Sequence, residues 1–177
     1  LTGPHTPWLP DSSHRGTSKA GQYGDFVQHV DQAVGSVLEQ LKKQGLEENT
    51  LVVFASDNGP FWRPHHVEEF GHSATRQLRG MKGDVYEGGH RIPFIIRWPG
   101  KVKAGSVSDA LTTLTNLMAT CADIIGDKNV AFKPEDSYSI MNVLQGKETK
   151  VSNQSAIIHS ASNGFFAIRK DNWKLIE

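Results

Sequence analysis

Asp57 and Asn58 are two neighbouring oxygen ligands that follow an apolar run in the middle of the chain. The run LVVFA at residues 51–55 shows no alternation of polar and apolar side chains, which predicts a strand covered on both faces. Polar groups at the carboxyl end of such a strand lie where open α/β sheets bind ligands. Carboxylate and amide oxygens suit Ca²⁺ or Mg²⁺ better than Zn²⁺, so the pair is a candidate metal site. A tight turn capped by Asp57 is the structural alternative.

The segment RGMKGDVYEGGHR, residues 79–91, places Lys82 among four glycines. Glycines let a backbone approach an anion closely, and a lysine there neutralises sulfate or phosphate oxygens as a point charge. The segment is not a P-loop, because the order G-x-x-x-x-G-K-[ST] is missing. Solvated cations on a surface loop are the alternative interpretation.

His5 lies between Pro4 and Pro7, whose fixed φ angles predict a stiff loop. A histidine presented in this way suits a proton donor or an anion contact, although an ordinary surface histidine is the alternative. Four other histidines have no spacing that favours a metal and are candidates only for lining a pocket: His14, His65, His66 and His72. We interpret His29 and His159 as structural.

Composition and the lack of several motifs exclude other kinds of chemistry. Nineteen basic and nineteen acidic residues cancel, so net charge favours neither nucleic acid nor an anionic membrane as a partner. No apolar run predicts a membrane-spanning helix or a signal peptide. There is no G-x-S-x-G nucleophile, and Cys121 falls on an apolar helical stripe, where we expect a buried, inert thiol.

The elements that position these residues alternate between helix and strand. Apolar residues recurring at three and four predict a helix over 25–44, which ends before Gly45 and leads into a strand over 51–56. About thirty residues without clear periodicity follow. We expect a functional loop there, because loops of that length in compact domains are usually functional or disordered and this one is rich in aromatic residues and histidines. A second strand is predicted over 93–98.

The remaining third of the chain changes character. Asn116 is the expected N-cap of a helix over 116–125 that ends at Gly126, with Leu117, Met118, Cys121, Ile124 and Ile125 as its apolar stripe. From about residue 155, short segments separated by ASNG and KDN predict an antiparallel meander with hairpin turns.

Taken in order, these motifs resemble the C-terminal half of a formylglycine-dependent sulfatase of the alkaline-phosphatase superfamily. The similarity is carried by PHTPW, by YGDFVQHVDQAVGSVLEQLKKQGLEENTLVVFASDNGP and by LRGMKGDVYEGGHRIPFIIRWPGKVKAGS. The resemblance implies an α/β fold, a partial alkaline-phosphatase-like doubly wound sandwich with a small C-terminal antiparallel sheet. Residues 1–126 would belong to the catalytic domain, 127–149 would be a connection, and 150–177 would form strands of the small subdomain.

The resemblance also implies roles for the candidate residues. Asp57 and Asn58 match calcium ligands, Lys82 matches a lysine that contacts the sulfate, and His5 matches a histidine on the leaving-group side. The remaining Ca²⁺ ligands and the formylglycine, made from the Cys or Ser of C/S-x-P-x-R, are expected on an N-terminal part that this chain lacks. We therefore expect no turnover from these residues alone.

The implied partners are a sulfate ester and the missing N-terminal half, without nucleic acid or membrane. Because the chain begins with Leu1 rather than Met, we expect that upstream sequence exists. Loss of that half would expose a sheet edge and favour self-association. Family members are commonly exported (periplasmic or secreted) or lysosomal, but the chain carries no address that confirms this.

Two alternatives remain open at this point. One is a phosphate or phosphonate ester hydrolase of the same superfamily, although the zinc enzymes generally have histidine where Asn58 stands. The other is a truncated, non-catalytic domain. Sugar sulfates and aryl sulfates are equally open as substrates.

Overall fold

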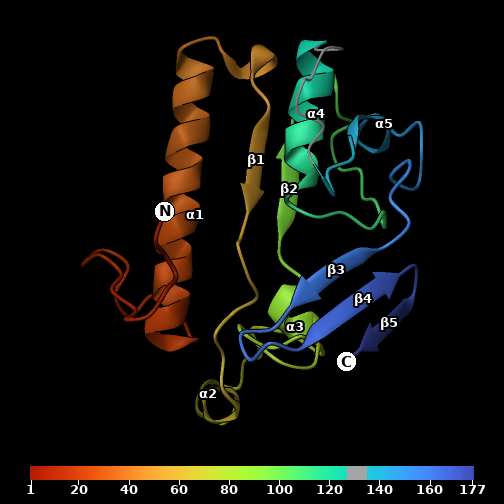
Figure 1. Ribbon diagram of the computed structural model, residues 1–177. Helices are drawn as coiled ribbons and strands as arrows, with labels where there is room; N and C mark the ends of the chain where they lie inside the picture. Colours follow the sequence, from red (N-terminus) through yellow and green to blue (C-terminus); the bar gives the residue numbers. More distant parts are fainter. Residues whose placement is uncertain (127–134) are drawn as a thin grey trace. The chain divides into compact units, whose positions relative to one another are not determined.

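The computed structural model describes residues 1–126 and 135–177. They form two compact units, one of residues 1–50 and 54–94 and the other of residues 51–53 and 95–177. Figure 1 shows the helices and strands of both units. The predicted connection over 127–149 lies partly outside the described residues, and the predicted division into 1–126 and 150–177 stays a prediction. Within the described residues, no helix has both the length and the apolar character needed to cross a membrane.

Helix α1, Gly21–Lys43, is the main helix of the first unit. It ends where predicted, since Gly45 has a φ of 66°, a left-handed conformation that glycine adopts without strain. It begins four residues earlier than predicted. The buried carboxylate of Asp25 accepts hydrogen bonds from the backbone N–H groups of Gly16 and Ser18, at 2.8 and 2.7 Å, and so anchors the preceding loop. Val37, which we expected on the apolar stripe, is 57% exposed.

The segment between the two predicted strands is partly helical rather than a continuous loop. A short 3₁₀ turn, Glu47–Asn49, leads into β1, Val52–Ala55, which is paired in a two-stranded sheet with β2, Phe94–Arg97. Helices α2, Pro64–Phe70, and α3, Glu87–His90, interrupt the predicted loop. Proline at the first position starts α2, and left-handed Gly71 ends it. The helix is too short for a periodic pattern of apolar residues to predict it.

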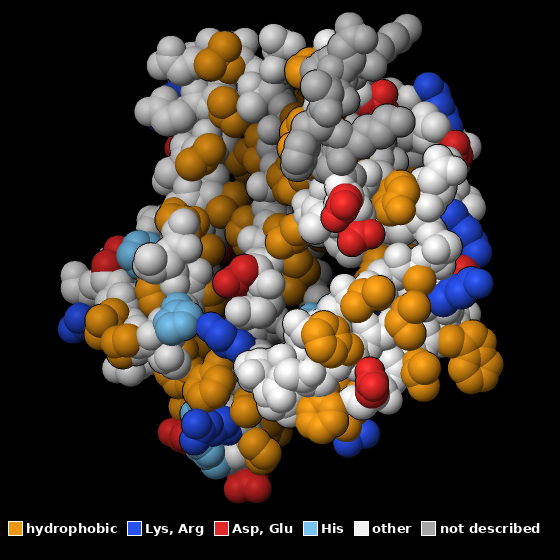
Figure 2. Space-filling model, viewed as in Figure 1, with side chains coloured by type: hydrophobic (Ala, Val, Ile, Leu, Met, Phe, Trp, Pro, Cys, Tyr) orange, Lys and Arg blue, Asp and Glu red, His pale blue; other side chains and the backbone are white. Residues whose placement is uncertain are grey.

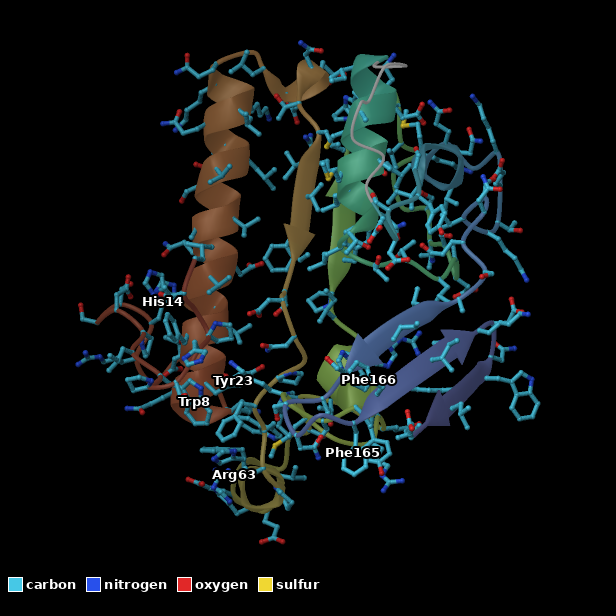
Figure 3. All side chains as sticks on the ribbon, in the orientation of Figure 1. Trp8, His14, Tyr23, Arg63, Phe165 and Phe166 are labelled. Atoms are coloured by element: carbon cyan, nitrogen blue, oxygen red, sulfur yellow. The ribbon has the colours of Figure 1, made fainter. Side chains whose placement is uncertain are left out.

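An aromatic cluster centred on Trp62 is the core of the first unit. Trp62 is 5% exposed, and its indole N–H donates to the backbone oxygen of His72 at 2.8 Å. Its ring centroid lies 4.8 Å from that of Tyr23 on α1, 4.8 Å from His66 on α2 and 5.9 Å from Trp8. These contacts join the N-terminal loop, α1 and α2, which are far apart in the sequence. Figure 3 shows Trp8 and Tyr23 side by side at the start of α1.

In the second unit, Asn116 on α4, Asn116–Ile125, is the centre of a buried polar network. The residue is fully buried. Its side-chain oxygen accepts from the N–H of Thr113 at 2.7 Å, and its amide group donates to the oxygens of Tyr138 and Gln154, both at 2.9 Å. The bounds of the predicted helix are confirmed, including its end at left-handed Gly126. The predicted N-cap is wrong: Thr115 holds that position, because the Asn116 side chain bonds to distant segments instead.

The buried side of α4 is polar, so the predicted apolar stripe is not its buried face. Asn116 and Thr120 are its buried residues, and the Thr120 hydroxyl accepts from the N–H of Ile140 at 3.1 Å. Met118 is 53% exposed and Ile125 is 76% exposed. Cys121 is also exposed, which corrects the expected burial of its thiol.

The predicted C-terminal meander is confirmed. Strands β3, Ile157–Ser160, β4, Phe166–Lys170, and β5, Trp173–Ile176, form an antiparallel sheet in that order. Short helix α5, Met141–Leu144, precedes it. In register, Ile158 is opposite Ile168, which is opposite Leu175, and all three side chains are exposed on one face of the sheet. Hydrophobic side chains are visible over this sheet in Figure 2.

Candidate functional site after strand β1

The turn that follows β1 presents Asp57 and Asn58. The hydroxyl of Ser56 donates to the backbone oxygen of Asn58 at 2.9 Å, and the Asn58 amide donates to the oxygen of Gly59 at 2.9 Å. Asp57 is exposed and Asn58 is half-buried. Among residues 1–126 and 135–177, no group donates a hydrogen bond to the Asp57 carboxylate or forms an ion pair with it.

Close backbone contacts hold this turn against the glycine-rich segment. The N–H of Gly59 donates to the oxygen of Gly89 at 2.8 Å, and the N–H of Lys82 donates to the oxygen of Pro60 at 2.9 Å. A Cβ at Gly59 would lie 1.9 Å from the oxygen of Gly88, so this approach requires glycine. The structure thus brings the backbone of Lys82 beside the turn that carries Asp57 and Asn58, and the roles of the three side chains stay predictions.

Lys82 itself is half-buried. Its loop is held by Asp84, whose carboxylate accepts from the N–H of Met81 at 2.9 Å. Among the described residues the Lys82 ammonium group has no hydrogen-bond or ion-pair partner. An unpaired cation on a loop fixed by backbone bonds is suited to an anion.

His5 lies on the N-terminal loop of the first unit, and contacts other than those around Lys82 hold this loop in place. It is exposed, and its Nδ1 lies 2.6 Å from the backbone oxygen of Thr6. The loop lies against α1 at Gly3, where a Cβ would be 2.7 Å from the Val30 side chain. Trp8 anchors the same loop to Trp62, as described above. These contacts fix the loop but record no direct contact between His5 and Lys82, so the catalytic role of His5 stays a prediction.

A cavity of about 750 Å³ opens beside the turn, wholly within the first unit. Pro60 and Gly88 line it on the side of the candidate site, and Arg76, Gln77 and Arg91 contribute polar groups. Cavities of this volume are of the size that holds small-molecule ligands. The sequence predicted a functional loop in this region but did not single out Arg76, for which no local pattern gives a signal.

Two titratable groups in the aromatic cluster have shifted pKa values. Burial raises the pKa of Tyr23, because the charged phenolate loses solvation. Burial also lowers the pKa of His66, with smaller contributions from its neighbours. The Nδ1 of His66 accepts from the N–H of Arg63 at 3.1 Å, which suits the neutral ring. Both residues contact Trp62, so these pKa shifts arise in the aromatic core of the first unit and not at Asp57, Asn58 or Lys82.

The carboxylate of Asp57 and the side-chain amide oxygen of Asn58 are the kinds of ligand that bind Ca²⁺ in proteins. A calcium ion takes six to eight oxygen ligands, so these two residues can supply only part of its coordination. The structure also brings together Asp11, His14 and His29, which the sequence pattern did not connect; the interpretations of His29 as structural and of His14 as a pocket-lining residue stay predictions.

Comparisons with known proteins agree on one family. A family model described as Sulfatase matches residues 1–126. The chain is 33% identical to an N-acetylgalactosamine-6-O-sulfatase of Bacteroides thetaiotaomicron, covering 98% of the chain and 34% of that protein. It is 32% identical to an arylsulfatase of Hemicentrotus pulcherrimus, covering 96% of the chain and 30% of that protein. The chain thus spans about a third of the length of these relatives.

Solved structures show the same similarity in three dimensions. A structure from work on glycosaminoglycan metabolism by Bacteroides thetaiotaomicron superposes with a TM-score of 0.87 at 33% identity, covering 100% of this chain and 37% of that one. The PsFucS1 sulfatase from Pseudoalteromonas sp. superposes with a TM-score of 0.81 at 30% identity, covering 98% of this chain and 34% of that one. These similarities confirm the predicted α/β, alkaline-phosphatase-like fold.

Proposed function

Because the chain belongs to the sulfatase family, we propose that it is the C-terminal part of a sulfate ester hydrolase and supplies Asp57, Asn58, Lys82 and His5 to the active site. The observation that carries the proposal is the pair of backbone hydrogen bonds, Gly59 to Gly89 and Lys82 to Pro60, that joins the Asp57 turn to the Lys82 loop. An unpaired carboxylate and an unpaired ammonium group are thereby held on adjacent segments. Their closeness along the backbone supports binding of a cation and an oxyanion together.

Lys82 has the main electrostatic role in this proposal. Cleavage of a sulfate ester places negative charge on the departing oxygen, and a fixed cation there stabilises the transition state more than the ground state. His5 donates a proton or a hydrogen bond on the leaving-group side. Asp57 and Asn58 would hold a Ca²⁺ ion through their side-chain oxygens. Calcium would polarise the sulfate group, and formylglycine, expected on residues outside this chain, would supply the nucleophile.

We propose that the leaving group is a sugar. The cavity beside Pro60 is lined by Arg76, Gln77 and Arg91, whose N–H groups can donate to hydroxyls and anionic groups of a carbohydrate. Support also comes from the relatives, since the name of one is N-acetylgalactosamine-6-O-sulfatase.

The test is sulfate release by the protein containing this chain together with the rest of the sulfatase. Substrates are N-acetylgalactosamine 6-sulfate, an aryl sulfate and the matching phosphate esters. We expect Lys82→Ala to lower kcat by about 10²–10³, whereas Lys19→Ala, an exposed lysine of the same unit, leaves it unchanged. Chelation of Ca²⁺ should abolish activity and added Ca²⁺ should restore it. Release of phosphate without sulfate, or equal activity of the two lysine variants, would overturn the proposal.

A further inference from the structure

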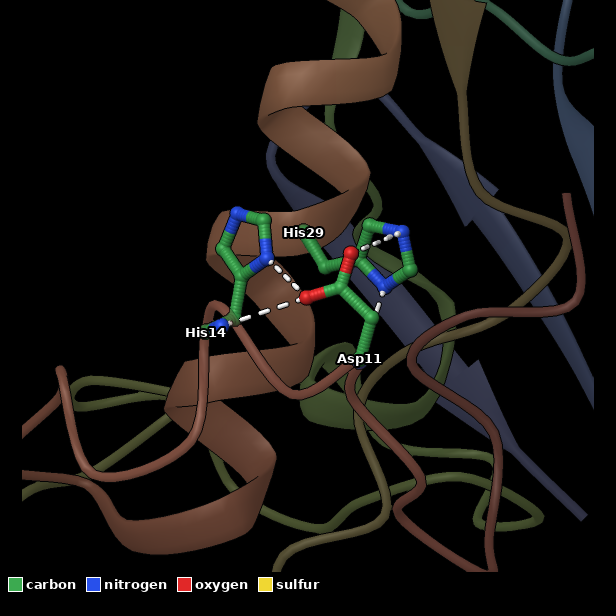
Figure 4. Close-up of side chains that lie close together, drawn as sticks. All are labelled: Asp11, His14 and His29. Atoms are coloured by element: carbon green, nitrogen blue, oxygen red, sulfur yellow. Dashed lines mark hydrogen bonds and ion pairs between the residues drawn. The ribbon is translucent and has the colours of Figure 1, made fainter.

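Asp11, His14 and His29 form a compact cluster in the first unit, shown in Figure 4. The Nδ1 atom of His14 lies 2.6 Å from Oδ1 of Asp11, and Nε2 of His29 lies 3.5 Å from Oδ2 of the same carboxylate. The two imidazole rings stack at 17° with centroids 4.9 Å apart. One ligand atom from each residue lies within 4.8 Å of the other two. The carboxylate is therefore flanked by two imidazoles.

Local structure orients these three side chains independently of any ion. Asp11 begins a turn in which its Oδ1 accepts from the backbone N–H groups of Ser13 and His14, at 3.2 and 3.1 Å. His29 projects from α1, and the N–H of Asp11 lies 3.4 Å from its Nδ1. The groups are thus close before binding, which reduces the conformational entropy that a ligand must overcome.

We propose that Asp11, His14 and His29 bind a divalent ion of the zinc type and so fasten the N-terminal loop to α1. Two imidazole nitrogens and one carboxylate oxygen suit Zn²⁺, Co²⁺ or Ni²⁺, whereas Ca²⁺ prefers oxygen ligands alone. This site lies outside the sulfatase machinery proposed above, which uses oxygen ligands at Asp57 and Asn58. The N-terminal loop also carries His5, so the ion would stabilise the segment that presents that residue.

The distances fit such an ion after a small adjustment. Zinc–ligand bonds of about 2.0–2.1 Å in a tetrahedral site place neighbouring ligand atoms about 3.4 Å apart. The 3.5 Å between His29 Nε2 and Asp11 Oδ2 already matches that spacing. The 2.6 Å from His14 to Oδ1 is a hydrogen-bond distance, so the His14 ring must rotate slightly toward the ion beside Oδ2. Asp11 is 45% exposed and His29 35% exposed, which leaves room for a water ligand.

Protonation sets the pH dependence of the site. Hydrogen bonds from His14 and Ser13 lower the pKa of Asp11 to about 2, so the carboxylate is ionised at neutral pH. Binding moves the ring proton of neutral His14 to Nε2 and that of neutral His29 to Nδ1, where the 3.4 Å contact with Asp11 is lost. Neutral rings therefore release no proton overall, whereas each protonated ring must lose one. Binding weakens as the pH falls.

The test is calorimetric titration of the purified protein with Zn²⁺ in saturating Ca²⁺, with Co²⁺ absorption as a second probe. We expect one saturable site and a ligand-field spectrum for bound Co²⁺. His29→Gln and Asp11→Asn should each weaken Zn²⁺ binding by at least about tenfold. The matched control is His65→Gln, an exposed histidine on α2 outside the cluster, which should bind Zn²⁺ like the unmodified protein.

Two further points make the result decisive. Asp11→Asn keeps an oxygen acceptor for the backbone N–H groups of Ser13 and His14, and circular dichroism checks that each variant folds. Asp57→Asn should leave Zn²⁺ binding unchanged, so the zinc site and the sulfatase proposal succeed or fail separately. Absence of saturable Zn²⁺ or Co²⁺ binding, or equal affinity in all variants, would show that the cluster holds only hydrogen bonds and would overturn the proposal.

Discussion

Gly59 is the position where a single methyl group tests how the candidate site is assembled. Its Cα lies so close to the backbone of α3 that an added Cβ would be 1.9 Å from the oxygen of Gly88. Both residues are buried, and the obstacle is backbone rather than a flexible side chain. Gly59→Ala must therefore move the turn that carries Asp57 and Asn58.

The size of the effect follows from the geometry. Ordinary contact begins at 3.4 Å, so the Cβ and the oxygen of Gly88 must separate by about 1.5 Å. Overpacking of this kind destabilises by about 1–3 kcal/mol, and loss of the 2.8 Å Gly59 to Gly89 hydrogen bond adds about 1 kcal/mol. A displacement of about 1 Å at a catalytic group can lower activity by about 100-fold.

The assay compares two glycine-to-alanine variants by denaturant unfolding and by sulfate release. Gly35→Ala is the matched control, because Gly35 lies within α1 and a Cβ there meets nothing within 4 Å. Gly35→Ala should be more stable than the unmodified protein by about 0.5–1 kcal/mol, since alanine is a better helix former than glycine. If Gly59→Ala unfolds at the same denaturant concentration as the control and retains full activity, the close packing of the turn against α3 is wrong.

Three other predictions concern the supporting structure. Asn116→Leu should lower the free energy of unfolding by about 2–4 kcal/mol in urea titrations, because it leaves three half-buried groups, on Thr113, Tyr138 and Gln154, without their partner; an unchanged midpoint would contradict this. The pKa of His66 is lowered on folding, so stability should be full above the unfolded pKa of about 6.5 and decline as the pH falls through the folded value; His66→Gln should remove that component from melting curves measured between pH 5 and 8. The pKa of Asp25 is lowered, chiefly by the N–H of Gly16, so its contribution should be present above the unfolded pKa of about 3.9 and be lost as the pH falls further. Asp25→Asn should reduce the loss of unfolding free energy that is measured as the pH falls in the acid range. An unchanged pH dependence there would exclude this contribution of Asp25.

Elements with strong local signals were predicted correctly. The helix over 116–125 has the predicted bounds because Gly126 adopts a left-handed conformation that ends it locally. The C-terminal meander was predicted because short β-prone segments alternate with turn residues, and its antiparallel register is confirmed. Weak local signals explain the missed helices α2 and α3, which have seven and four residues, too few for a periodic pattern.

The prediction of a buried face from apolar periodicity was wrong for α4, where long-range polar contacts decide which side of the helix is buried. Cys121 repeats with apolar neighbours, yet it is exposed, because α4 turns Asn116 and Thr120 toward the segment containing Tyr138 and Ile140. Those hydrogen-bond partners lie about twenty residues away in the chain, so no window around the helix could reveal them.

The sequence by itself determined the family, the fold class and the identity of the candidate residues, because those depend on motifs and on local patterns of side chains. Tertiary structure decided which residues meet. Only the folded chain joins the Lys82 loop to Pro60 and brings His29 of α1 to Asp11, eighteen residues earlier. The physical reason is that hydrogen bonds and ligand geometry act over a few ångströms in space, whatever the separation along the chain.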